Sequence, residues 1–99
     1  MNFEYNVDGT VLKLTLDKKL SAVTAEQLEK ELAEKLVGVK DFTIDMAKLA
    51  YVSSAGLRVL LKAQRQVAQN GTMKIINAVP EVMRIFETTG FKEILNIEN

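Results

Sequence analysis

After one opening hairpin, segments patterned as strands alternate with segments patterned as helices along the whole chain. On both sides of Asp8-Gly9, a tight-turn pair, apolar and polar residues alternate, which predicts two antiparallel strands. The later segments extend the predicted order to β-β-α-β-α-β-α-β. This order is typical of a mixed sheet with helices packed on it, because each helix links two strands. The apolar hairpin residues are Phe3, Tyr5, Val7, Leu12, Leu14 and Leu16.

Three segments have the apolar spacing and the end signals of helices. The first has Thr24 as the N-cap of a capping box and Gly38 as its stop. The second spans residues 54–69. The third begins at Pro80, which the first turn of a helix tolerates, and ends at Gly90. The predicted apolar stripes are Leu28, Leu32 and Leu36; Leu57, Leu60, Leu61, Val67 and Ala68; and Val82, Ile85 and Phe86.

Three short apolar segments, residues 41–46, 73–78 and 94–97, are predicted as further strands. In the second of these, Ile75-Ile76 indicates burial on both faces of the sheet. We therefore expect an α/β fold with a mixed sheet of about four to five strands and helices packed on it. The chain has 99 residues and is 47% hydrophobic, which fits one domain over residues 1–99.

The composition excludes several classes of protein. Thirteen basic and thirteen acidic side chains cancel, so nothing indicates a nucleic-acid partner. Without Cys or His, the chain offers no disulfide, no thiolate metal site and no histidine base. The first residues lack a signal-peptide pattern, and no apolar run approaches the roughly 20 residues that span a bilayer. We expect a cytoplasmic protein with no membrane insertion, no metal and no cofactor.

Side chains suited to catalysis are also sparse. The carboxylates of the first helix are expected to form a solvated face with the pairs Glu26–Lys30 and Glu31–Lys35. The glycines are spread out as turn and cap residues and form no phosphate-binding run. We therefore expect no catalytic residue, and a protein that is not an enzyme.

Ser53 and Ser54 stand between a predicted strand and the second helix. A serine at a helix start accepts a hydrogen bond from a free backbone N–H, and either serine could do this alone. Alternatively, one serine caps the helix while the other stays exposed as a covalent acceptor. The positive end of the helix would tolerate a phosphate at this place. A nucleophilic serine of a hydrolase would need a base, and the chain has no histidine.

The segment from Ile44 to Leu57, with Asp45 inside it, resembles the signature of the STAS family. This family contains anti-sigma factor antagonists and sulphate-transporter domains, and its signature places an Asp-Ser-Ser-Gly-Leu sequence at a helix start. Residues 20–25 resemble the family's entry to its first helix, and residues 80–91 resemble its third helix and the turn after it. The resemblance covers nearly the whole chain.

The resemblance implies an anti-sigma factor antagonist. In such members the residue after the motif aspartate is phosphorylated by the partner, an anti-sigma factor that is a serine kinase, and only the unphosphorylated form binds that partner. The matching position is Ser54, with Ser53 as the second candidate. Ser53 and Ser21 both stand where the family usually has aspartate. One alternative is a STAS docking module of a signalling scaffold or transporter complex that is not phosphorylated. Another is an enzyme or a nucleotide-binding protein.

The partner is expected to dock around the serine turn and the loop before the first helix, because loops at one end of neighbouring strands lie together. Arg58 and two lysines would make this surface positive. Few residues come after Ile97, so the last strand is expected to be poorly covered, which would favour a homodimer. The predicted docking residues are Lys18, Lys19, Ser21, Ser53, Ser54, Gly56 and Arg58.

Overall fold

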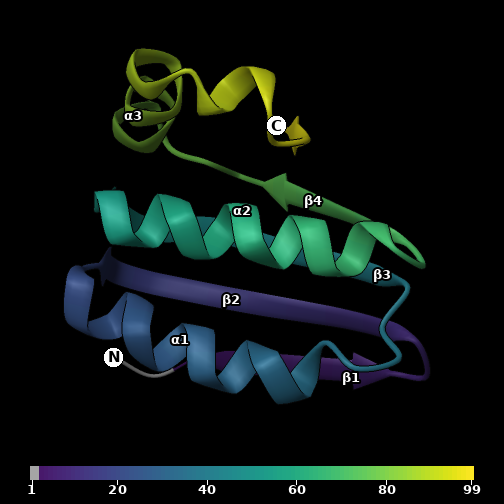
Figure 1. Ribbon diagram of the computed structural model, residues 1–99. Helices are drawn as coiled ribbons and strands as arrows, with labels where there is room; N and C mark the ends of the chain where they lie inside the picture. The colour runs from purple at the N-terminus through teal and green to yellow at the C-terminus, as the bar shows by residue number, and fades with distance from the viewer. Residues whose placement is uncertain (1–2) are drawn as a thin grey trace.

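Five strands form one mixed sheet in the computed structural model, which describes residues 3–99 (Figure 1). They lie side by side in chain order, and β1 pairs antiparallel with β2 while every later pair is parallel. This arrangement confirms the predicted α/β class and the predicted order of elements. The strands are β1 (Glu4–Asp8), β2 (Val11–Leu20), β3 (Asp41–Val52), β4 (Thr72–Ile76) and β5 (Ile97–Glu98).

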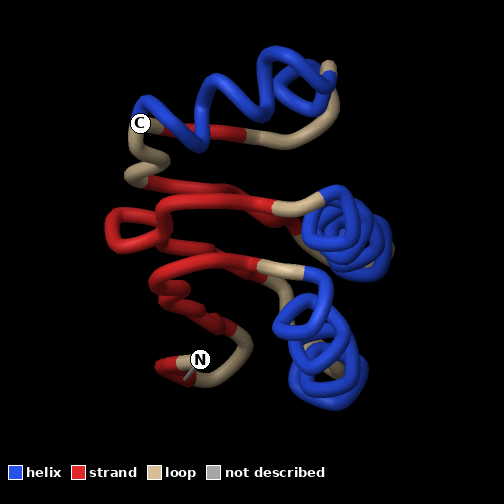
Figure 2. The backbone as a smooth tube through the Cα atoms, turned by 90° about the vertical axis from the view of Figure 1, so that its left-hand side faces the viewer, coloured by secondary structure: helices blue, strands red, loops and turns tan. Residues whose placement is uncertain are grey.

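Each pair of consecutive parallel strands is joined through a helix, as parallel strands require. The helices are α1 (Ala22–Lys35), α2 (Ser54–Ala68) and α3 (Pro80–Thr89), and a 3-10 turn, η1 (Phe91–Glu93), comes after α3. Figure 2 shows α1 and α2 side by side on one side of the strands, whereas the opposite side of β2 and β3 carries no helix. The sheet therefore has one covered face and one open face.

Strict alternation along the strands separates these two faces. Lys13, Thr43 and Lys74 are register neighbours on the open face. Ile76 lies on this face too and is partly exposed, so the expectation that both isoleucines are buried is wrong for Ile76. The strand residues of the covered face are Leu12, Leu14, Leu16, Phe42, Ile44, Met46, Met73 and Ile75.

β2 and β3 continue well past the rest of the sheet. β3 runs to Val52 rather than ending at residue 46, and beyond Asp45 it pairs with β2 alone. The pairing shifts register twice in this stretch, and Lys18 has a positive φ of 58°. Lys18 and Lys19 therefore belong to β2 and not to a loop before α1. The two-stranded extension carries the starts of α1 and α2 outward at the carboxyl end of the sheet.

The start of α1 differs from the expectation by three residues. Ser21, not Thr24, is the N-cap, and its side chain accepts a hydrogen bond from the Thr24 backbone N–H at 3.2 Å. Thr24 is the third helical residue and closes the capping box, because its hydroxyl accepts from the Ser21 backbone N–H at 2.8 Å. The same hydroxyl donates to the Lys19 carbonyl at 3.1 Å.

The charged face of α1 is partly tied to β1. Glu26 and Lys30 form the expected pair at 3.6 Å, but the expected pair of Glu31 with Lys35 is absent from residues 3–99. Glu31 accepts a hydrogen bond from the Tyr5 hydroxyl at 3.0 Å instead, and the Lys35 ammonium lies over the Tyr5 ring. Burial, reinforced by the Glu31 carboxylate, raises the pKa of the Tyr5 phenol well above its ordinary value.

Two other sequence predictions need correction. Ile94 and Leu95 are not part of a strand, because the chain forms η1 first and only two residues pair in β5. On α2, Val59 and Ala63 lie in the core, whereas Leu61 is only partly buried and Ala68 is exposed. Over residues 3–99 the helices are all too short or too polar to cross a bilayer.

Candidate functional site

The turns that lead into α1 and α2 lie against each other at the carboxyl end of the sheet. The Ser53 backbone N–H donates to the Leu20 carbonyl at 2.9 Å, which joins the second turn to the residue just before the first. In the two strands, Lys19 is in register with Tyr51, and Leu20 with Val52. The structure thus brings together the two groups of residues that the sequence predicted to be neighbours.

Ser53 is the N-cap of α2. Its backbone is extended (φ −78°, ψ 169°), and its side-chain oxygen accepts a hydrogen bond from the Gly56 backbone N–H at 3.0 Å. Its carbonyl accepts the first intrahelical bond, from Leu57, at 2.9 Å. Because its backbone and its side chain are both engaged, Ser53 has a structural role at this turn.

Ser54 is the first residue of α2 and is exposed. Its hydroxyl has no hydrogen-bond partner among residues 3–99, in contrast to the hydroxyl of Ser53. The structure therefore assigns the cap to Ser53 and leaves the Ser54 hydroxyl exposed at the surface, as both possibilities left open by the sequence allow.

Gly56 is buried beneath this turn. An added Cβ would lie 3.0 Å from side-chain atoms of Leu20 and Val52, closer than nearly all such contacts in proteins. Gly56 thus lets α2 approach the ends of β2 and β3, and because it is buried it offers little surface to a partner.

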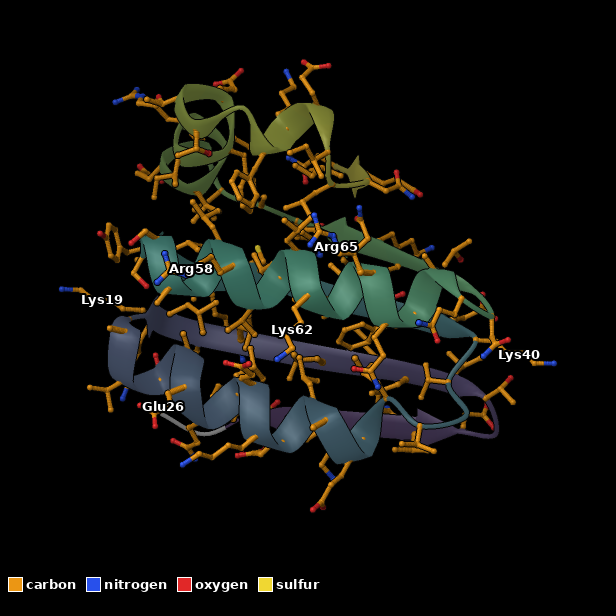
Figure 3. The ribbon with its side chains drawn as sticks, viewed as in Figure 1. Lys19, Glu26, Lys40, Arg58, Lys62 and Arg65 are labelled. Atoms are coloured by element: carbon orange, nitrogen blue, oxygen red, sulfur yellow. The ribbon has the colours of Figure 1, made fainter. Side chains whose placement is uncertain are left out.

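The charges around the turn are mostly positive. Lys18, Lys19 and Arg58 are exposed, and the first turn of α2 contains no acidic residue. Figure 3 places Lys19 and Arg58 at the same end of the molecule, at the start of α2. Ser21, which caps α1, is partly buried next to them.

Asp45 lies elsewhere, on the open face of the sheet. Its carboxylate accepts hydrogen bonds from the Ala47 backbone N–H at 3.0 Å and the Asn77 side chain at 3.3 Å. The other carboxylate oxygen lies 3.8 Å from the Lys13 ammonium. Asp45 therefore links β2, β3 and the segment after β4, and the structure keeps it apart from the serine turn.

Two features of this region escaped the sequence reasoning. Tyr51 is 46% exposed beside Lys19, and the only signal for it was an aromatic residue at an outward position just before Val52. The second feature is a shallow groove between α1 and α2. It consists of two adjoining halves, each with a volume of about 420 Å³. The ion pair of Lys62 with Glu29, at 2.6 Å, spans it. Its signal was the set of alanines on the facing sides of the two helices, Ala22, Ala25, Ala33, Ala55 and Ala63.

The described part of the chain holds no group of three or more acidic, His or Cys side chains arranged for a metal ion. What remains is an exposed hydroxyl at a helix start, with exposed cations and one exposed aromatic ring at the same end of the sheet. Such a surface can accept a covalent anion and can contact an acidic or aromatic patch of another protein.

Comparison with known proteins identifies the family and the fold of the chain. The model of the STAS domain family matches residues 2–99. BtrV of Bordetella bronchiseptica, which carries the provisional name of an anti-sigma factor antagonist, is 36% identical over 101 residues. That match covers 89% of this chain and 87% of BtrV.

The fold is also shared with SpoIIAA, an anti-sigma factor antagonist whose structure is known without and with a phosphate. Unphosphorylated SpoIIAA matches with a TM-score of 0.84 and 19% identity, covering 99% of this chain and 89% of SpoIIAA. The phosphorylated form, from Bacillus, matches with a TM-score of 0.75 and 18% identity, covering 99% and 92%. At this level of identity the likeness establishes the fold alone.

Proposed function

Because the chain belongs to the STAS domain family, and within it to the anti-sigma factor antagonists, we propose that Ser54 is the phosphorylation site that switches it. In this proposal the unphosphorylated protein binds an anti-sigma factor that is also a serine kinase. Binding withdraws the anti-sigma factor from its sigma factor, and phosphorylation ends the binding. The protein itself acts as a regulator and not as an enzyme.

The division of roles between the two serines is the observation that carries this proposal. Ser53 is held by a side-chain hydrogen bond at 3.0 Å and a backbone hydrogen bond at 2.9 Å. Ser54 is exposed and its hydroxyl is unengaged within residues 3–99, so a kinase could reach it without breaking the cap.

The transfer itself requires ATP bound to the partner kinase. The Ser54 side-chain oxygen attacks the γ-phosphorus, the bond from that phosphorus to the β,γ-bridging oxygen breaks, and ADP leaves. The hydroxyl proton passes to a base of the kinase or to water. Since ATP and sigma factors are found inside the cell, the proposal places the protein in the cytoplasm.

The added phosphate would leave the fold intact and change the surface. It carries about −1.5 to −2 charges at neutral pH, and the start of a helix tolerates negative charge. At a closely packed protein interface the same charge is costly to desolvate and repels acidic groups. Docking is therefore lost while the domain remains folded.

We propose a docking face made of the exposed and partly buried residues around the serine turn. Gly56 is left out because it is buried, and Tyr51 is added because exposed aromatic rings often anchor interfaces. The docking face comprises Lys18, Lys19, Ser21, Tyr51, Ser53, Ser54 and Arg58.

The proposal is tested by purifying the tagged protein from its native cells and identifying what binds it. A serine-kinase anti-sigma factor should be recovered with the wild type and with Ser54→Ala. Ser54→Asp should lose most of this partner while its melting temperature stays close to that of the wild type. Equal recovery with Ser54→Asp would contradict the switch.

The Ser53 position favours one alternative, a STAS docking module that is not phosphorylated. A neutral serine stands where an aspartate is usual in the family, so a kinase would meet a different local charge. Recovery of scaffold or transporter proteins, with no phosphate on the chain and no kinase, would support this alternative and contradict the proposal.

A further inference from the structure

Arg58 lies one helical turn after Ser54 and is a cation without a salt-bridge partner in the described part of the chain. It is exposed. The next cation along the same side of α2, Lys62, is already paired with Glu29 at 2.6 Å. Arg58 therefore has unused donor capacity at the start of the helix.

The helix brings Arg58 toward Ser54. Residues four apart lie on the same face of a helix, and helical side chains lean toward the N-terminus, which here is the Ser54 end. Figure 3 shows the Arg58 guanidinium at the N-terminal end of α2. An anion that precedes a cation by four residues is also the more favourable of the two possible orders.

The chemistry of the two groups is well matched once a phosphate is present. A guanidinium offers a planar fork of N–H donors that can bind two phosphate oxygens together, and charge-assisted bonds of this kind are stronger than neutral ones. The unmodified Ser54 hydroxyl has no charge for Arg58 to pair with.

We propose that Arg58 is the internal counter-ion of phosphorylated Ser54, so that one modification removes two groups from the docking face. This inference rests on the proposed function for its biological meaning. Without the phosphate, Arg58 is available to an acidic side chain of the partner. When Ser54 carries the phosphate, the Arg58 guanidinium binds that phosphate on its own helix and is no longer available to the partner.

Charged groups on the neighbouring elements bear on this pair. Glu26 of α1 lines the same half of the groove as Arg58, but its carboxylate lies 3.6 Å from the Lys30 ammonium. Lys18 and Lys19, at the end of β2, add positive charge to the surroundings of the phosphate. Their side chains come from another element, whereas Arg58 is fixed at one turn from Ser54.

The test uses phosphoserine incorporated at position 54 during translation, so no kinase is needed. Titration by phosphorus NMR should show that Arg58→Gln raises the pKa of the phosphoserine by about 0.2–0.4, which is the strength of such helical pairs converted to pKa units. Arg58→Lys should raise it by less. Arg65→Gln is the matched control, because Arg65 is exposed and equally unpaired within residues 3–99 but lies on a later turn of α2, and it should change nothing.

A second control compares two helix starts. Phosphoserine placed at Ala22, the first residue of α1, has Glu26 and not an arginine four residues later, so its pKa should exceed that at position 54. An unchanged pKa in Arg58→Gln would overturn the inference even if a kinase modifies Ser54. A raised pKa would support the inference even if the natural partner does not phosphorylate the chain.

Discussion

The two strand-to-helix turns of this domain are built alike at the cap and differ in the first turn of the helix. Ser21 caps α1 with φ −80° and ψ 178°, and Ser53 caps α2 with φ −78° and ψ 169°. Both serines accept a hydrogen bond from the backbone N–H three residues later. The capping serine is thus a shared structural device and does not by itself mark a functional site.

The residues after the cap distinguish the two turns. The third helical residue is Thr24 in α1, where it closes a capping box, and Gly56 in α2, where it allows close packing. The first helical residue is Ala22 in α1 and Ser54 in α2. The turn before α1 is closed by its capping box and has no hydroxyl at the first helical position. The turn before α2 packs tightly against the strand ends through Gly56, and the Ser54 hydroxyl is exposed to solvent on its outer side.

The largest loss of stability should result from replacing Gly56 of α2 with threonine, the residue at the equivalent position of α1. Gly56→Thr would place Cβ and further atoms against Leu20 and Val52, which already lie 3.0 Å from an added Cβ. Overpacking of this kind costs about 1–3 kcal/mol of unfolding free energy. Urea unfolding measures the loss, and Gly56→Ala, which adds the Cβ alone, should lose less. Wild-type stability in Gly56→Thr would show that the turns are interchangeable.

A smaller loss is expected when the second cap is removed. Ser53→Ala leaves the Gly56 N–H without its side-chain acceptor and should cost about 1 kcal/mol. In a domain of this size that lowers the melting temperature by about 4–8 °C. Ser53→Asp is the matched control, because it keeps an acceptor oxygen and should melt near the wild type. A loss of equal size in Ser53→Asp would argue against the capping role.

The capping box of the first turn should contribute somewhat less. Thr24→Ala removes the acceptor of the Ser21 backbone N–H while leaving the Ser21 cap itself in place. We expect a loss of about 0.5–1 kcal/mol, the net value of an ordinary hydrogen bond. Thr24→Ser, which keeps the hydroxyl, should recover most of it. If both variants unfold like the wild type, the closed turn adds nothing to stability.

The smallest effect on stability belongs to Ser54. Its hydroxyl has no partner within residues 3–99, so Ser54→Ala should shift the unfolding free energy by less than about 0.5 kcal/mol. A calorimetric scan beside Ser53→Ala makes the comparison direct. A loss as large as that of Ser53→Ala would make Ser54 a structural residue and would remove the distinction between the two serines.

Much of the fold could be predicted from the sequence because its signals are local. The hairpin around Asp8-Gly9, the three helices and the stop at Gly90 depend on turn residues and apolar spacing. The predicted stop at Gly38 is less accurate, because α1 already ends at Lys35 with Leu36 as its C-cap. The length of β3 could not be predicted, because only Leu49 is buried among residues 47–51 and this stretch lacks the alternation of a strand. Pairing with the irregular end of β2 holds this stretch extended.

The sequence pattern alone also does not determine which residue caps each helix. Ser21 and Thr24 both carry side chains suited to capping, and what decides between them is where β2 ends, beside Val52. Ser53 and Ser54 pose the same choice, which the hydrogen bond from Ser53 to Leu20 resolves. Contacts between segments that are distant in the sequence determine both caps, so the local sequence pattern does not predict them.

The most direct test of this account is to locate the phosphate on the protein in its native cells. Trypsin should release residues 49–58, which contain both serines of the turn, and mass spectrometry then assigns the phosphate to one of them. We predict phosphate on Ser54 in the wild type and in Ser53→Ala, and none on this peptide in Ser54→Ala. Phosphate on Ser53, or an unmodified peptide under all growth conditions, would contradict the account.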